Sequence, residues 1–98
     1  MNQDKEKERC FRYILFLLGG RDYSSYQLIK KALDKDYSKD IIDQVVDKLI
    51  ELDYINNDRY IESLIRSYKG RKGYRFIFQK LIEKGFSGVE IEQKIESV

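Results

Sequence analysis

Apolar positions along the chain recur at three- and four-residue spacing, which is typical of amphipathic helices. The spacing is clear from Phe11 to Leu18, and the glycine pair at 19–20 is expected to end this first helix. No stretch of useful length alternates polar and apolar residues, so strands are not expected. The sequence therefore predicts an all-α protein.

Five further helices are predicted from their start signals, because Ser, Asn and Asp side chains accept hydrogen bonds from the free N–H groups of a first turn. Two of the starts are capping boxes, in which a Gln or Glu three residues later bonds back to the cap. The fifth helix of the chain starts at about Tyr74, and Gly85 ends it. The other start signals are Ser24 with Gln27, Ser38, Asn56 or Asn57 with Asp58 in the first turn, and Ser87 with Glu90.

Each predicted helix carries an apolar stripe that should face a core. Cys10 lies on the same side of the first helix as Ile14 and Leu17, so we interpret it as a small buried residue. The stripes consist of Phe11, Ile14, Leu15 and Leu18; Leu28, Ile29, Ala32 and Leu33; Ile41, Ile42, Val45, Val46, Leu49 and Ile50; Ile61, Leu64, Ile65 and Tyr68; Ile77, Phe78, Leu81 and Ile82; and Ile91, Ile95 and Val98.

The two halves of the chain match when the sequence is shifted by 49 residues. Helix starts then align with helix starts, and apolar positions with apolar positions. Within a single domain, 1–98, we interpret residues 10–52 and 56–98 as two tandem three-helix repeats, each resembling a helix-turn-helix unit. Such repeats are expected to form an elongated, curved helical domain. The matched pairs include Leu15/Leu64, Lys31/Lys80, Lys35/Lys84, Ser38/Ser87, Ile42/Ile91, Leu28/Ile77 and Tyr37/Phe86.

Composition argues against catalysis. The 98 residues include no histidine and one cysteine, so the commonest general base is missing and no internal disulfide can form. The carboxylates are spread at ordinary solvated spacing, and no phosphate-binding or dinucleotide fingerprint occurs. We therefore expect a protein that is not an enzyme and needs no cofactor or metal. The lone cysteine and the lack of a long apolar run favour a cytoplasmic location without membrane contact.

The charge is unevenly distributed, although its net value is only +2. Residues 63–82 contain six cations and no carboxylate, and the string "YKGRKGYRF" at 68–76 mixes cations, glycines and aromatic residues. Glycines let a backbone approach a ligand closely, and a helix start just after them adds a positive dipole end. This surface could contact phosphates and exposed bases, or an acidic protein groove, or it could be a solvated loop that aids solubility.

Three sequence blocks resemble those of the RecX family, whose members bind and restrain the RecA recombinase. They are "RDYSSYQLIKKAL" at 21–33, "YINNDRYI" at 54–61 and "KGRKGYRFIFQKLIEKGF" at 69–86. The resemblance covers roughly residues 10 to 97 and accounts for two of the family's usual three helical repeats. It implies a curved helical protein that lies in the groove of a RecA–DNA filament and hinders its extension, ATP turnover and strand exchange during recombination, DNA repair and the SOS response.

Seven cations are predicted to contact the partner, by pairing with carboxylates of the filament or with DNA phosphate. No small-molecule substrate is expected. Arg21 and Arg59 could instead pair locally with Asp22, Asp58 or other carboxylates near their helix starts. Two other functions stay open: a direct nucleic-acid-binding helical module without sequence specificity, and a helical adaptor for an unrelated protein. The predicted contact residues are Arg21, Arg59, Arg66, Lys69, Arg71, Lys72 and Arg75.

Overall fold

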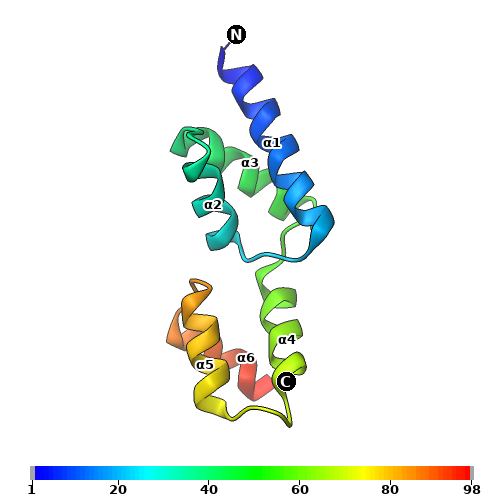
Figure 1. Cartoon of the computed structure of the whole chain (residues 1–98), viewed down its shortest axis with the longest axis vertical. Coiled ribbons are helices and arrows are strands. Elements are labelled where there is room, and N and C mark those ends of the chain that lie inside the picture. Colours follow the sequence, from blue (N-terminus) through cyan, green and yellow to red (C-terminus); the bar gives the residue numbers. More distant parts are fainter. Residues whose placement is uncertain (1, 98) are drawn as a thin grey trace. The chain divides into compact units, whose positions relative to one another are not determined.

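Six helices and no strand make up residues 2–97, the part of the chain that the computed structural model describes (Figure 1). The all-α prediction is therefore confirmed. None of the helices within 2–97 is both long and apolar enough to cross a membrane. The helices are α1 (Asn2–Gly20), α2 (Ser25–Asp34), α3 (Lys39–Glu51), α4 (Asn57–Tyr68), α5 (Tyr74–Glu83) and α6 (Gly88–Ser97).

The predicted helix starts are stabilised by local hydrogen bonds. The Ser24 hydroxyl accepts a bond from the Gln27 N–H at 3.2 Å, and the Ser24 N–H donates to the Gln27 side chain at 3.0 Å. The second capping box forms in the same way, with the Ser87 hydroxyl accepting from the Glu90 N–H at 3.2 Å. Ser38 accepts from the Ile41 N–H at 3.4 Å. The helices α2, α3 and α6 thus begin where their own sequence satisfies free N–H groups.

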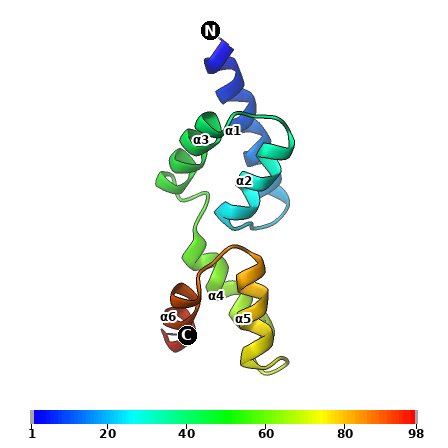
Figure 2. The same ribbon diagram turned by 90° about the vertical axis from the view of Figure 1, so that its left-hand side faces the viewer.

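The chain divides into two compact units, Met1–Asn56 and Asn57–Val98, each with its own apolar core. In unit 1, α1 and α2 pack on α3, and the core includes the fully buried Ile14, Leu28 and Leu49. In unit 2, α4, α5 and α6 pack on one another around Leu81 and Ile91 (Figure 2). The elongated, curved arrangement expected of the two repeats concerns their mutual placement and stays a prediction.

Three residues predicted to be buried are exposed. Leu33 is 42% exposed and Ile82 is 38% exposed, at the ends of α2 and α5. Each follows a fully buried residue, Ala32 or Leu81, and therefore points about 100° further round its helix. Ile50 is likewise 45% exposed, while Cys10 is completely buried, as predicted. The predicted core position Val98 lies outside the described residues.

The turn after the second helix has the same geometry in both units. Asp36 and Gly85, 49 residues apart, both have a positive φ, of 67° and 97°. The next residue, Tyr37 or Phe86, donates its N–H to the carbonyl of Ala32 at 3.3 Å or of Leu81 at 3.2 Å. Matching backbone bonds at matching positions support the interpretation of the two units as repeats of one plan.

The buried positions of the first helices, α1 and α4, do not match at the 49-residue shift that aligns the rest of the two units. Cys10 and Ile14 are buried in α1, but the residues 49 positions later, Arg59 and Ser63, are exposed. A shift of 51 residues pairs the two buried α1 positions with Ile61 and Ile65, which are buried in α4. The connection between the first and second helices therefore differs between the two units. In unit 2 this connection lies within the carboxylate-free stretch, residues 63–82.

Candidate partner-binding surface

The basic loop, residues 69–73, connects α4 to α5 within unit 2. Gly70 adopts a φ of 83°, a left-handed conformation that glycine reaches without strain, and this turns the chain out of α4. The N–H groups of Arg71 and Lys72 both donate to the Tyr68 carbonyl at 2.9 Å, which closes the turn. Five exposed cations on and beside this loop form what we name the basic cluster: Arg66, Lys69, Arg71, Lys72 and Arg75.

Arg71 has a structural contact that the sequence did not reveal. Its Nη2 and Nε atoms donate to the Ser67 carbonyl at 2.6 and 3.1 Å, and the guanidinium lies 5.7 Å from the Tyr68 ring centroid. A cation bonded to a carbonyl of the last helical turn stabilises the helix, because its charge is attracted to the negative end of the helix dipole. Arg71 therefore stabilises the end of α4, in addition to the partner contact predicted for it.

Aromatic rings beneath the loop organise two further cations. Tyr68 and Phe76 meet edge to face with their centroids 5.0 Å apart, which joins the end of α4 to the first turn of α5. The Nζ atoms of Lys72 and Lys80 lie 4.9 and 5.4 Å from the Phe76 centroid. Lys80 was absent from the predicted contact set, and its spacing of four residues from Phe76 on one helix was the available signal.

The first turn of α5 faces the basic loop without a side-chain cap. Its N-cap is Gly73, which makes no side-chain hydrogen bond, and no acidic residue follows in the turn. Arg75 lies in this turn, is exposed, and forms no ion pair within residues 2–97. A positive helix end beside cations is a favourable environment for an anion.

Arg66 lies on α4 close to a carboxylate that is already engaged. Glu62 accepts a hydrogen bond from Lys94 of α6 at 2.9 Å, and this bond is the main cause of a lowered pKa for Glu62. Arg66 lowers the same pKa further by its positive charge. The Lys94 pKa is raised chiefly by its bond to Glu62. An ion pair thus joins α4 and α6 within unit 2.

The two remaining predicted contact residues do not belong to the α4–α5 connection. Arg59 is exposed in the first turn of α4, two turns or about 10 Å along the helix from Arg66. Arg21 belongs to unit 1, where its guanidinium lies 4.6 Å from the Tyr23 centroid. Its Nε donates to the backbone carbonyl of Asp22 at 3.4 Å, not to the carboxylate that was considered as a local partner.

The site therefore consists of organised cations on one helix connection, without the groups that bind metals. Within residues 2–97, no three acidic or cysteine side chains are grouped as metal ligands would be. Cys10 is buried and its pKa is raised to about 11, mainly by burial and then by the negative charge of Glu6, so it stays a thiol at neutral pH. This arrangement can bind an anionic surface.

Comparison with known proteins gives consistent results. Residues 10–49 match the family described as "RecX, first three-helix domain". The chain is 33% identical over 90 residues to "Regulatory protein RecX" of Actinobacillus pleuropneumoniae, covering 90% of this chain and 59% of that protein. It is 31% identical over 93 residues to the protein of the same name from Haemophilus ducreyi, covering 93% of this chain and 61% of that one.

A solved structure agrees with this result. The crystal structure of RecX from Lactobacillus salivarius superposes with a TM-score of 0.89 at 26% identity, covering 94% of this chain and 61% of that chain. Fold and surface together define an all-helical protein of three-helix units with a basic helix connection. The resemblance to the RecX family that the sequence blocks indicated is confirmed. The chain spans about three fifths of the length of the two relatives named above.

Proposed function

We propose that this protein binds the RecA recombinase filament and restrains its ATPase, its extension and strand exchange. The relatives are named regulatory proteins, and the blocks that carry the likeness include the basic loop. The observation that carries the proposal is the basic cluster itself. It gathers five exposed cations on one connection of unit 2, in a stretch of 20 residues without a carboxylate. Such a surface is complementary to an acidic groove.

The loop is also organised before a partner arrives. Arg71 is bonded to Ser67, and the Tyr68–Phe76 ring contact joins the two helices. A surface that is already ordered loses less conformational entropy on binding than a flexible loop would lose. Several contacts made by one chain along a filament would add avidity, so each contact can be modest.

The test is RecA ATPase activity on single-stranded DNA, titrated with the native chain and with a Lys69→Glu, Lys72→Glu, Arg75→Glu variant. Arg71 is kept, because its bond to Ser67 supports the fold of α4. The matched control reverses three exposed lysines of unit 1: Lys7, Lys30 and Lys48. We expect inhibition by the native chain and the control, and about tenfold or more weaker inhibition by the loop variant, because each lost ion pair becomes a repulsion.

Two results would contradict the proposal in different ways. If the native chain does not inhibit, RecA restraint is wrong for this chain. If the loop variant and the control weaken inhibition equally, the chain acts on RecA through its overall charge, and the basic cluster is not the contact surface. Circular dichroism of each variant checks that the helices are retained.

Direct binding to nucleic acid is the second candidate function. It is favoured by the cations held against the Phe76 ring and by the uncapped start of α5, which suit phosphates. Binding to bare oligonucleotides should then weaken steeply with salt, because each neutralised phosphate releases counterions. A titration of fluorescent single-stranded DNA at two salt concentrations, without RecA, separates this function from the first.

A further inference from the structure

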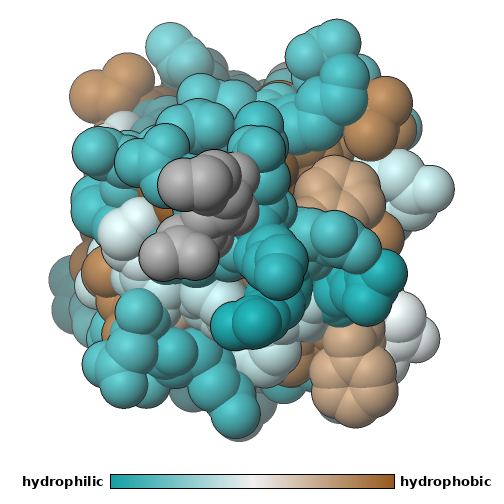
Figure 3. Space-filling model, turned by 90° about the horizontal axis from the view of Figure 1, so that it is seen from above, coloured by the Kyte–Doolittle hydropathy of each residue, from teal (hydrophilic) through white to brown (hydrophobic). Residues whose placement is uncertain are grey.

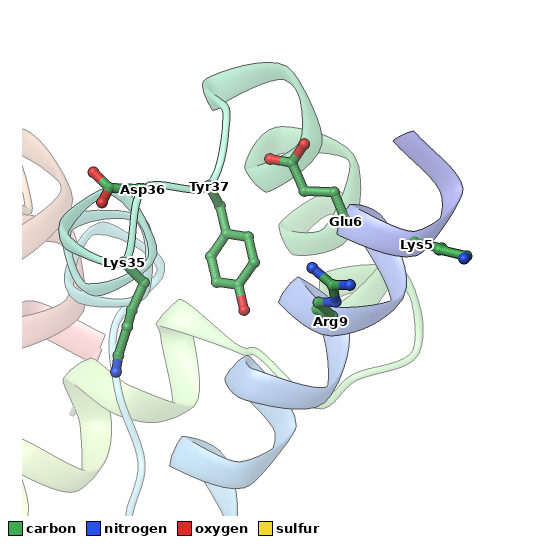
Figure 4. Close-up of a pocket in the computed structure, with 6 residues that line it drawn as sticks. All are labelled: Lys5, Glu6, Arg9, Lys35, Asp36 and Tyr37. Carbon is green, nitrogen blue, oxygen red and sulfur yellow. The ribbon is translucent and has the colours of Figure 1, made fainter. Parts of the chain in front are cut away.

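Unit 1 contains a polar cleft that the basic cluster does not touch. It opens between α1 and the turn from α2 to α3, with a volume of about 480 Å³. Figure 4 shows the Tyr37 ring extending from the turn, with its hydroxyl between the side chains of Arg9 and Lys35. Lys5 points away from the others. The lining residues are Lys5, Glu6, Arg9, Lys35, Asp36 and Tyr37.

Three hydrogen-bond donors in this cleft lack an acceptor. Within residues 2–97, neither the exposed Arg9 and Lys35 nor the Tyr37 hydroxyl forms a hydrogen bond or an ion pair. Lys35 is held only by the face of the Tyr13 ring, 5.5 Å from its centroid. The three donors therefore line one cleft without a protein acceptor in residues 2–97, with Arg9 and Lys35 exposed to solvent.

Neither of the two carboxylates that line the cleft within residues 2–97 forms an ion pair or a hydrogen bond with these donors. Glu6 accepts a hydrogen bond from the Ser38 N–H at 2.8 Å, at the start of α3. The Asp36 carboxylate points to the other side of its turn in Figure 4. An anion that enters between Arg9 and Lys35 would meet donors on both sides, while Glu6 stays bonded to the Ser38 N–H and keeps its negative charge.

Unit 2 has no equivalent of this cleft in its described part. The residue matching Tyr37 is Phe86, which has no hydroxyl and is only 6% exposed because it packs on Tyr60. In addition, the 51-residue shift of the first helices matches Arg9 with Tyr60, a buried residue of α4 that carries no charge. The cleft depends on two residues that only unit 1 has at these positions, the arginine and the tyrosine.

Figure 3 shows the molecule from the end at which α1 begins, and hydrophilic side chains cover most of that face. We propose that the cleft binds a phosphate group through Arg9, Lys35 and the Tyr37 hydroxyl. Two cations and a hydroxyl arranged around one cavity match the several oxygens of a phosphate, and Arg, Lys and Tyr commonly bind phosphate in this way. The proposal does not rest on the proposed function, because the cleft contains no residue of the basic cluster.

The test is a nuclear magnetic resonance titration of the full chain with sodium phosphate against sodium chloride at equal ionic strength. Saturable shifts are expected at the amides of Arg9, Lys35, Tyr37 and Ser38. A second titration uses a short oligothymidylate, which distinguishes a backbone phosphate from the free ion. The basic-cluster variant Lys69→Glu, Lys72→Glu, Arg75→Glu is titrated in parallel, so that binding at the cleft is separated from binding at the loop.

Three variants identify the donors. We expect Arg9→Gln and Lys35→Gln each to weaken binding about fivefold, the upper range for an exposed charge pair. Tyr37→Phe keeps the ring contact with Tyr13, whose centroid is 6.1 Å away, and removes only the hydroxyl, so a smaller loss is expected. The matched control is Lys30→Gln, an exposed lysine of α2 outside the cleft.

The outcomes decide the proposal and the source of the phosphate. Saturable shifts with phosphate or oligonucleotide that Arg9→Gln and Lys35→Gln weaken, and Lys30→Gln does not, support the cleft. Shifts from the oligonucleotide alone assign it to a nucleic-acid backbone. The proposal is overturned if neither probe gives saturable shifts, or if the cleft variants bind as tightly as the native chain.

Discussion

The connections between first and second helices differ in what they achieve in the two units. In unit 1, Ser24 is fully buried and caps α2 through a box with Gln27. At the matching position of unit 2, Gly73 leaves the start of α5 without a side-chain cap, and cations surround it. One plan is therefore used in two ways: unit 1 satisfies its helix start internally, whereas unit 2 leaves it available to an outside anion.

Removing the cap of unit 1 should have the largest effect on stability. Ser24→Ala should lower the free energy of unfolding by about 1–2 kcal/mol, because the α2 N–H groups lose their acceptor. Amide hydrogen exchange of α2, measured by nuclear magnetic resonance, should accelerate to match. The control is Ser87→Ala, whose hydroxyl caps α6 at an exposed position and should cost less. Unchanged exchange in α2 would show that the capping box does not stabilise unit 1.

Arg71 tests whether the basic loop also stabilises its own unit. Arg71→Gln should destabilise the last turn of α4 by about 0.5–1 kcal/mol, because the charged hydrogen bonds to Ser67 are lost. Lys72→Gln removes the same charge without breaking those bonds and serves as the control. Hydrogen exchange at the end of α4 should respond to the first substitution only. An equal response to both would mean that Arg71 acts only through its charge.

The third helices give a comparison that depends on pH. The buried Val45 of unit 1 matches Lys94 of unit 2, which forms the ion pair with Glu62. The Glu62 pKa is lowered from its ordinary value of 4.5, so the ion pair stabilises unit 2 fully above that pH. The contribution is lost as pH falls through the lower pKa of the folded state.

The protection of the α6 amides against hydrogen exchange, relative to the unfolded chain at the same pH, should therefore fall below pH 4.5 in the native chain. Lys94→Gln should make this dependence shallower, since Glu62 then loses the partner that lowers its pKa. Lys48→Gln, at an exposed position of α3, is the control. An unchanged acid dependence in the Lys94 variant would mean that the ion pair is not formed in solution.

The smallest stability effect is expected from giving unit 2 the cap that it lacks. Gly73→Ser should stabilise α5 by only a few tenths of a kcal/mol, since glycine is already a tolerable N-cap. The site accepts a side chain, because a Cβ at Gly73 meets no atom within 4 Å. The added hydroxyl competes with an outside anion for the same N–H groups, so inhibition of RecA ATPase should weaken. Undiminished inhibition would show that the helix start plays no part in binding.

The helix starts could be predicted because their signals are local. Ser24 with Gln27, and Ser87 with Glu90, lie three residues apart and satisfy each other without help from the rest of the fold. The extension of α1 to Asn2 carries no apolar periodicity, and the bond that Glu6 accepts from the Ser38 N–H joins residues 32 positions apart. Contacts of this kind depend on packing and cannot be inferred from spacing.

The candidate site was predictable in part for the same reason. The pattern of charges and glycines located the basic loop. Five of the seven predicted contact residues lie on this loop or beside it. The backbone bond of Arg71 and the position of Lys80 over Phe76 depend on how the loop turns at Gly70. The cleft of unit 1 combines α1 with a turn about 30 residues later, so no local motif indicates it.

The central claim is that the basic cluster of unit 2 contacts the partner, and photo-crosslinking tests it most directly. A photoreactive group is placed at position 72 in one variant and at position 30, an exposed lysine of unit 1, in another. Each is irradiated with RecA assembled on single-stranded DNA. The proposal predicts crosslinks to RecA from position 72 and few from position 30. Equal crosslinking from both positions, or crosslinking from position 72 to DNA alone, would contradict it.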